Sequence, residues 1–261
     1  MKTLGFLGMG NMAKAISGGL IEKGAIPAEN IYAYDVLQDK LAETAKEQGF
    51  RPCATAEELV KNADAVLVAV KPFLVEAVLS PLKDLLKDKV LLSVAASWDF
   101  ARYETILDPS TRHLFIMPNT PALVGDGVLL LEETHSLTAE EFGQVSRWME
   151  TLGVVRTLPS SLMNIGGTVS SCSPAFFALV VEALADAGVM YGLPRQTAYD
   201  LAAQAMAGSG KMLLETGMHP GQLKDMVCSP KGTTIAGVAA MEEKGARTAL
   251  IEAVKAAMAR Y

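Results

Sequence analysis

The sequence predicts an α/β domain over residues 1–158, followed by an all-helical domain over residues 159–261. Up to about residue 157, short apolar runs alternate with helical segments, which is typical of a parallel sheet flanked by helices. After Pro159 the chain is rich in Ala, Leu and Met, and only short segments containing Gly or Pro interrupt it. Half of the 261 residues are apolar, so a substantial core can be buried.

The apolar runs place the elements in order. The predicted strands cover residues 3–8, 31–35, 65–70, 90–96 and 112–117. The predicted helices of the same part cover residues 11–24, 38–48, 73–86 and 99–107. In the second domain, the helices predicted at 176–190 and 196–215 carry apolar residues on more than one face, which indicates burial against partners. These partners are expected to include a second subunit.

Composition and charge argue against several classes of function. The formal net charge is -6 and no long basic run is present, which disfavours nucleic acid and anionic membranes as partners. The three cysteines lie far apart, so neither a disulfide framework nor a metal site is predicted. The apolar segments at 4–7 and 178–190 are too short for a signal peptide or a membrane span. We expect a cytoplasmic protein that acts on a small molecule.

A glycine-rich turn follows the first predicted strand and opens the first predicted helix. Gly8 allows a tight turn, Gly10 lets the backbone approach a pyrophosphate, and Ala13 keeps the helix close to the strand. Asp35 ends the second predicted strand, where a carboxylate hydrogen-bonds the ribose hydroxyls of a dinucleotide. This combination predicts a Rossmann-type dinucleotide-binding domain.

Asp35 also bears on the choice of cofactor. A carboxylate at this position repels the 2′-phosphate of NADPH, and no arginine follows at 36–39 to offset that repulsion. The residue therefore favours NADH, while Lys40 leaves NADPH open.

Other candidate site residues lie in loops that follow predicted strands, because open α/β sheets bind ligands at the carboxyl ends of their strands. The loop at 69–72 offers the charge of Lys71, and the loop at 95–97 is small enough for a ring or ribose to lie against it. The loop at 117–121 holds Asn119 between two prolines. Each loop alone is ordinary turn chemistry, but together on one edge they predict a cleft.

A second candidate site lies near the other end of the chain, where a Ser-Pro-Lys-Gly-Thr-Thr turn at 229–234 runs into an Ala-rich helix. Free backbone N–H groups at a helix start, beside the hydroxyls of Ser229, Thr233 and Thr234, predict an anion site with a carboxylate as its natural guest. The alternative is that Ser229 or Thr233 only caps its own helix. The dinucleotide motif near the N-terminus favours the anion site.

With both motifs in hand, the chain resembles the pyrroline-5-carboxylate reductases over nearly its whole length. The resemblance rests on GFLGMGNMAKAISGGL near the start, AVKP at 69–72, MPNTPALVGDGV at 117–128 and HPGQLKDMVCSPKGTTIAGVAAMEEKG at 219–245. It implies NAD(P)H-dependent reduction of 1-pyrroline-5-carboxylate to L-proline, the last step of proline biosynthesis. It also implies a Rossmann domain and a helical dimerisation domain, with active sites between the two domains. The expected assembly is an intertwined homodimer that can assemble into larger rings.

The resemblance further assigns roles to individual residues. Cofactor contacts are implied at Gly8, Gly10, Asn11, Met12, Ala69, Val70, Lys71, Pro72, Ala95, Ala96 and Ser97. Substrate contacts are implied at Ser229, Gly232, Thr233 and Thr234. The hydroxyl of Thr234 is expected near the ring nitrogen. No metal or catalytic histidine is expected, because a protonated imine is already electrophilic and needs mainly positioning and charge placement.

Several positions depart from the family pattern. A glutamate expected near Ser160 is missing, and Ser171 and Cys172 stand in a segment that is usually rich in glycine. Lys231 and Ser97 each replace a glycine. These departures leave a related imine acid open as the substrate, such as a piperideine or an isomeric pyrroline carboxylate.

Two other classes of protein fit part of the pattern. β-Hydroxyacid dehydrogenases share the two-domain plan but need a lysine near the start of the second domain, and this chain has no lysine between Arg156 and Lys211. A non-catalytic dinucleotide-binding sensor would not need the hydroxyls of Ser229, Thr233 and Thr234.

Overall fold

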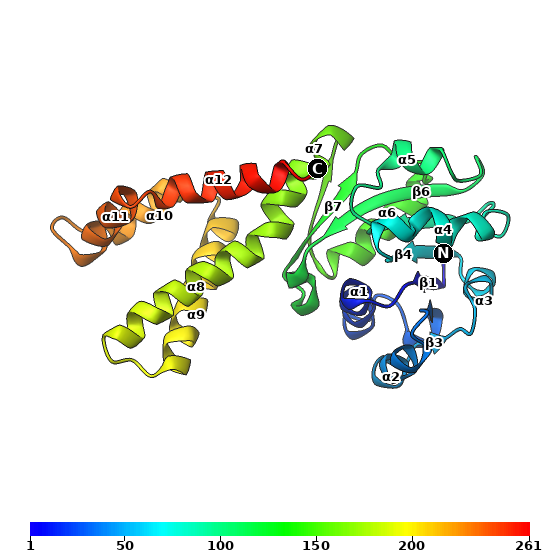
Figure 1. Ribbon diagram of the computed structural model, residues 1–261, viewed down its shortest axis with the longest axis horizontal. Coiled ribbons are helices and arrows are strands. Elements are labelled where there is room, and N and C mark those ends of the chain that lie inside the picture. Colours follow the sequence, from blue (N-terminus) through cyan, green and yellow to red (C-terminus); the bar gives the residue numbers. More distant parts are fainter. The chain divides into compact units, whose positions relative to one another are not determined.

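The computed structural model describes residues 1–261. The chain divides into two compact units, Met1–Ser171 together with Tyr261, and Cys172–Arg260. A β-sheet flanked by helices forms the first unit and helices alone form the second, which confirms the predicted fold class (Figure 1). The domain boundary expected after residue 158 stays a prediction, since compact units and functional parts of a chain need not divide at the same residue.

One eight-stranded sheet forms the centre of the first unit, in the order β3-β2-β1-β4-β5-β6-β7-β8. Its strands are β1 (Leu4–Leu7), β2 (Ile31–Tyr34), β3 (Arg51–Pro52), β4 (Ala65–Val68), β5 (Val90–Ser93), β6 (Arg112–Pro118), β7 (Gly127–Glu132) and β8 (Gly153–Leu158). Strands β1 to β6 are parallel, which places their carboxyl ends at one edge. Strands β7 and β8 lie beyond the predicted strands; β7 is antiparallel to β6 and parallel to β8.

Helices cover both faces of this sheet. The α-helices are α1 (Asn11–Glu22), α2 (Gln38–Gln48), α3 (Ala56–Asn62), α4 (Val75–Leu79), α5 (Phe100–Glu104), α6 (Ala139–Glu150) and α7 (Ser160–Gly167). Short 3₁₀ helices are η1 (Ala28–Asn30), η2 (Pro72–Leu74), η3 (Ser80–Leu82) and η4 (Thr120–Val124). The single helix predicted at 73–86 is wrong, because Pro81 has no N–H to continue the hydrogen-bond ladder beyond α4.

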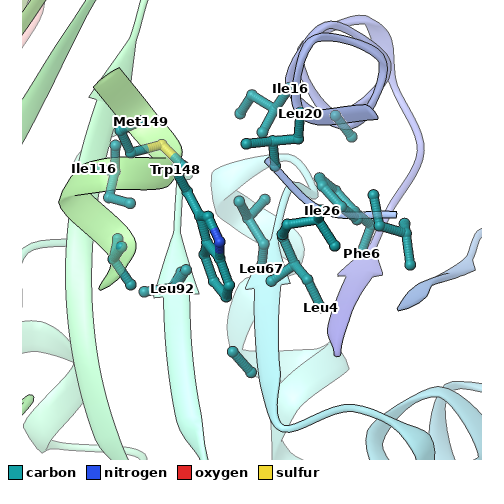
Figure 2. Packing of buried hydrophobic residues seen from close by; sticks show 14 of the residues in the cluster. Leu4, Phe6, Ile16, Leu20, Ile26, Leu67, Leu92, Ile116, Trp148 and Met149 are labelled. Atoms are coloured by element: carbon teal, nitrogen blue, oxygen red, sulfur yellow. The ribbon is translucent and has the colours of Figure 1, made fainter. Parts of the chain in front are cut away.

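One face of the sheet packs against α1 and α6. Figure 2 shows Ile16 and Leu20 of α1 and Trp148 and Met149 of α6 around strand residues such as Leu67. All five side chains are buried, and the alternation of a strand places every second residue in this core. The same hydrophobic core therefore stabilises both the sheet and α1, the helix that follows the glycine-rich turn.

The other face is covered by segments that follow β3, β4 and β5. Val66 and Val68 of β4 point to this side and pack in one cluster with Leu59 of α3, Leu79 of α4 and Tyr103 of α5. All of them are essentially inaccessible to water. Burial on both faces explains why β4 has a continuous apolar sequence instead of an alternating one.

The second unit contains α8 (Ser173–Met190), α9 (Arg195–Thr216), α10 (Pro220–Val227), α11 (Thr233–Glu243) and α12 (Ala246–Met258). Helices α8 and α9 pack against each other, and α11 packs against α12. Only the small side chains of Ala185, Ala198 and Ala202 are buried in this unit. Large apolar side chains remain exposed, among them Leu179, Leu184, Leu201, Leu214, Met226, Met241 and Ile251. A single copy of the unit therefore leaves most of its apolar surface uncovered.

Helix α7, a π-helical segment η5 (Thr168–Cys172) and α8 follow one another without a break over residues 160–190. This stretch is longer than the segment predicted from sequence, and its 31 residues reach a mean hydropathy of 1.5 over an 18-residue window. Its length and composition would allow it to cross a membrane. Core helices of globular proteins share these properties.

Gly153 at the start of β8 yields a prediction about the sheet. Its φ is +149°, and an added Cβ would lie 2.0 Å from the carbonyl oxygen of Gly127 on β7. Gly153→Ala should therefore lower the free energy of unfolding by about 2–5 kcal/mol, through backbone strain and a clash that no side-chain rotation relieves. Urea unfolding of the full chain measures the loss.

The control for this substitution is Gly24→Ala. Gly24 also has a positive φ, of +67°, but a Cβ added there would have no atom within 4 Å. The control should therefore cost only about 1–2 kcal/mol. Equal losses for the two variants would contradict the proposed clash between β7 and β8.

Candidate functional site

A cavity of about 700 Å³ opens at the carboxyl edge of the parallel strands. Its walls come from the segments that follow β1, β2, β4 and β5, together with the start of α1. This volume lies within the range of about 300–1,000 Å³ that is common for small-molecule and cofactor sites. The expected cleft at this edge is therefore present in the first unit, but the prediction is wrong for the loop at 117–121, which does not line the cavity.

The glycine-rich turn forms one wall of the cavity. Gly8 has a φ of +94°, and a Cβ there would lie 3.0 Å from the carbonyl oxygen of Ala69. Gly10 is the N-cap of α1 and has no side chain that could accept a bond from the first turn of the helix. No acidic residue stands in that first turn. The start of α1 therefore offers free N–H groups and a positive helix end to an anion.

Asp35 closes the neighbouring wall. Its Oδ2 accepts a hydrogen bond from the backbone N–H of Met9 at 2.7 Å, and its Oδ1 accepts one from Leu37 at 2.9 Å. The carboxylate is thus held beside the glycine-rich turn by two N–H donors, and each carboxylate oxygen keeps a lone pair that can accept from a ligand hydroxyl. A negative charge is fixed at the place where the second strand ends.

Most of the residues predicted to bind a cofactor line this one cavity. They are Gly8, Gly10, Asn11, Met12, Asp35, Ala69, Val70, Lys71, Pro72, Ala95 and Ala96. Ser97 does not line it and instead extends the same loop with a φ of +64°. The assignment of these residues to a cofactor stays a prediction, but in the fold all of them except Ser97 line the same cavity.

Sequence reasoning missed the apolar part of the cavity. Val36 and Leu37 beyond β2, with Leu74 and Val78 beyond β4, line it as well. Leu74 and Val78 are four residues apart, so the helical period could have placed them on one face. Only the pairing of β1 with β2 and β4 shows that Leu74 and Val78 line the same cavity as Val36 and Leu37.

The loop at 117–121 has a structural role in this chain. Asn119 is buried, accepts a hydrogen bond from the N–H of Val128 at 2.8 Å and donates one to the carbonyl oxygen of Ser170 at 2.9 Å. The hydroxyl of Ser171 donates to the carbonyl oxygen of Pro118. These bonds tie the loop to β7 and to the end of the first unit.

The predicted anion turn is present at the start of α11 in the second unit. Gly232 is the N-cap, with no side-chain capping bond and no acidic residue in the first helical turn. The hydroxyls of Ser229, Thr233 and Thr234 make no hydrogen bond within the chain. The alternative in which Ser229 or Thr233 caps its own helix is therefore wrong, and the N–H groups and hydroxyls are free for a ligand.

The geometry of this turn depends on Gly232 and Lys231. The N–H of Gly232 donates to the carbonyl oxygen of Ser229 at 2.9 Å, and a Cβ on Gly232 would lie 2.4 Å from the Ser229 hydroxyl oxygen. Lys231 has a φ of +58°, a conformation that glycine adopts more readily. Its side chain is exposed and makes no ion pair.

Several reactive groups outside this cavity are buried or paired. Burial raises the pKa of the Cys53 thiol to about 11, which makes it a poor nucleophile. Burial also lowers the pKa of His113, although the carboxylate of Glu104 at 2.7 Å opposes this shift. A cavity at the opposite edge of the sheet has charged walls, but there Arg112 is paired with Glu141 at 2.8 Å.

Two family models match the chain. Residues 160–261 match the model described as pyrroline-5-carboxylate reductase dimerisation, and residues 3–97 match the model described as NADP oxidoreductase, coenzyme F420-dependent. The second match covers every residue predicted to bind a cofactor, and the first covers the anion turn at 229–234.

Full-length relatives share the same name. The pyrroline-5-carboxylate reductase of Treponema pallidum is 41% identical over 259 residues, which cover 98% of each chain. The Escherichia coli enzyme is 41% identical over 258 residues, covering 98% of this chain and 96% of its own.

Solved structures agree with this relationship. The Coxiella burnetii pyrroline-5-carboxylate reductase has a TM-score of 0.90 and 30% identity, with 99% of this chain and 97% of that chain covered. The Plasmodium falciparum pyrroline carboxylate reductase, solved with NADP bound, has a TM-score of 0.89 and 29% identity over 99% and 96% of the two chains.

A buried carboxylate beyond the cavity gives a pH-dependent prediction. Glu132 at the end of β7 is fully buried, and its Oε2 accepts the N–H of Phe100 at the start of α5. Burial raises its pKa above the ordinary value, and the nearby Asp99 adds to this shift, while bonds from Ser160 and Phe100 oppose it. The folded state therefore holds a proton more tightly than the unfolded chain, so this residue costs stability as pH rises above the ordinary carboxyl pKa.

Glu132→Gln removes this titration. Relative to the wild type, the variant should become progressively more stable between about pH 4 and pH 7. Urea unfolding at several pH values measures the difference, with Glu133→Gln at the exposed neighbouring position as control. A Glu132→Gln difference that stays constant or falls with pH would contradict the assignment.

Proposed function

Because the chain belongs to the pyrroline-5-carboxylate reductase family, we propose that it reduces 1-pyrroline-5-carboxylate to L-proline with a nicotinamide dinucleotide, preferably NADH. The observation that carries the proposal is the start of α11. Its free N–H groups and the unbonded hydroxyls of Ser229, Thr233 and Thr234 suit a small carboxylic acid with a ring nitrogen. The enzyme is an oxidoreductase that acts on a C=N bond.

The cavity of the first unit fits the cofactor. Gly8 leaves the space beside Ala69 that a Cβ would fill, and the uncapped start of α1 suits a pyrophosphate. The apolar residues Leu74 and Val78 suit the flat adenine. When bound, the reduced nicotinamide supplies the hydride for the C=N bond. Lys71 and the small loop at 95–97 complete the proposed cofactor site.

The turn at 229–234 acts on the substrate. The N–H groups of Thr233 and Thr234 hold the carboxylate, with the hydroxyls of Ser229 and Thr233 as further donors. The hydroxyl of Thr234 orients the ring nitrogen. Gly232 keeps the turn open, because a larger residue would collide with the Ser229 side chain. Preorganised donors of this kind supply positioning and charge stabilisation without a nucleophile or a metal.

The remaining parts of the proposal concern assembly and location. We assign residues 1–158 to dinucleotide binding and residues 159–261 to dimerisation and substrate binding, in a homodimer that can form larger rings. The exposed apolar side chains of α8 to α12 support association of two copies, since a stable dimer would cover them. We assign the protein to the cytoplasm, in line with its net charge of -6 and its separate cysteines.

The proposed reaction can be tested with purified protein, NADH or NADPH, and 1-pyrroline-5-carboxylate. We expect loss of nicotinamide absorbance together with formation of proline. A six-membered cyclic imine acid and small β-keto acids, assayed in parallel, separate this reaction from the related-imine and hydroxyacid alternatives. No oxidation of either dinucleotide with the five-membered imine would contradict the proposal.

Thr234→Ala tests the role of the hydroxyl in that assay. It should lower kcat/KM for the imine by about 10- to 100-fold, because a donor to the reacting nitrogen is lost, while dinucleotide affinity stays within about twofold. Thr248→Ala, at an exposed position of α12 whose hydroxyl has no hydrogen bond, is the matched control. Equal activity of the two variants would remove the proposed role of Thr234.

Asp35→Asn tests the choice of cofactor. The substitution keeps the shape and one acceptor of the side chain but removes the charge that repels a 2′-phosphate. The ratio of kcat/KM for NADPH to that for NADH should rise about 10-fold or more. Asp39→Asn makes the same change in the first turn of α2, outside the cavity, and should leave the ratio unaltered. An unchanged ratio in Asp35→Asn would overturn the role of Asp35 in the choice between the two dinucleotides.

A further inference from the structure

Two loops of the dinucleotide cavity are joined by one tryptophan. The loop at 69–72 follows β4 and the loop at 95–97 follows β5, and both contribute to the cavity wall. Trp98 comes directly after the second loop and is only 2% exposed. Its indole N–H donates to the carbonyl oxygen of Pro72 at 2.8 Å. No other hydrogen bond joins these two loops.

Arg102 of α5 fixes the same loop from outside. Its guanidinium carbon lies 4.1 Å from the centre of the Trp98 ring, and its Nη1 donates to the carbonyl oxygen of Ser97 at 3.2 Å. Ser97 has a φ of +64°, which a non-glycine residue keeps only where its surroundings hold it. The stacked pair of Trp98 and Arg102 supplies such surroundings.

The other end of the loop is anchored below the cavity. The hydroxyl of Ser93 accepts the N–H of Ala95 at 3.1 Å and interacts with the hydroxyl of Tyr103. The Tyr103 ring lies 5.1 Å from the Trp98 ring, centre to centre. The loop at 95–97 is therefore attached to β5 at its start and to Trp98 at its end, and Trp98 provides its one hydrogen bond to the neighbouring loop at 69–72.

We infer that Trp98 is a positioning residue for the dinucleotide, which sets the spacing between the loops at 69–72 and 95–97. Neither Trp98 nor Arg102 lines the cavity, so both act through these loops. A cavity whose walls are already spaced needs no ordering when the ligand enters, which favours affinity. The inference rests on the proposed function, because it takes the ligand of this cavity to be a nicotinamide dinucleotide.

Trp98→Phe tests this inference, since phenylalanine keeps a ring but has no N–H to donate. Titration of the full chain with NADH and with NADPH, followed by their own fluorescence, should show both dissociation constants raised about three- to tenfold. The factor should be the same for the two dinucleotides, because the lost bond lies away from Asp35. The KM for the imine acid should stay within about twofold.

Trp148→Phe is the matched control. Trp148 is the only other tryptophan of the chain and is likewise buried, but it packs in the core beneath α6 and does not line the cavity. The control should lose stability in urea without weakening either dinucleotide by more than about twofold. Similar weakening by both substitutions would show a general effect of stability and would overturn the inference.

Arg102→Met covers the case in which Trp98→Phe does not fold. Arg102 is exposed, so its replacement should not disturb the core, and it should weaken both dinucleotides about two- to threefold through the freed Ser97. If the Trp98 and Arg102 variants both bound the dinucleotides as tightly as the wild type, the inference about Trp98 would be overturned and the proposed function would stand. A wild-type protein that binds neither dinucleotide would instead overturn the proposed function, and this inference with it.

Discussion

The pairing of β1 between β2 and β4 is the constraint on which the cavity of the first unit depends. It brings Gly8, Asp35 and Ala69 to one edge, although they lie far apart in the sequence. The N–H of Gly8 donates to Tyr34 and the N–H of Ala69 donates to Leu7, so backbone bonds fix the turn from both sides. The sheet therefore sets the gap between the turn at Gly8 and the segments that follow β2 and β4, and the carboxylate of Asp35 adds a bond to the N–H of Met9.

The two proposed ligand sites share one feature, a helix start without a side-chain cap. Helices α1 and α11 each begin after a glycine in extended backbone, with no side-chain cap, whereas α6 is closed by Thr138. A glycine cap forgoes about a few tenths of a kcal/mol of helix stability relative to Ser or Asp, and most of the stability of such a helix comes from packing. Helix α1 obtains it from Ile16 and Leu20 in the core. Helix α11 has no buried residue in a single chain. In the proposed dimer, a second copy would cover its apolar face and so stabilise the helix that carries the proposed anion site.

Local chemistry made part of this molecule predictable from the sequence. The spacing of Gly8, Gly10 and Asp35 identified the glycine-rich turn and the end of the second strand. Each of these positions needs a particular residue type, either glycine for the backbone conformation or a carboxylate for its charge. The antiparallel β7 was missed, since the fully apolar run before Glu132 carries no signal of strand direction. The apolar wall that includes Leu74 was also missed, because only the strand order brings it to the cavity.

Backbone strain links the two candidate sites to their departures from the family pattern. Only three non-glycine residues have a positive φ, and two of them, Ser97 and Lys231, lie in the loop at 95–97 and the turn at 229–234. A side chain in this conformation costs about 1–2 kcal/mol relative to glycine. It also leaves the loop fewer alternative conformations than glycine would, so less ordering remains to be done when a ligand binds. Arg102 holds Ser97 in place, and the bond from Gly232 to Ser229 closes the turn around Lys231. Ser97 and Lys231 are therefore held by neighbouring groups in a conformation that glycine adopts more readily.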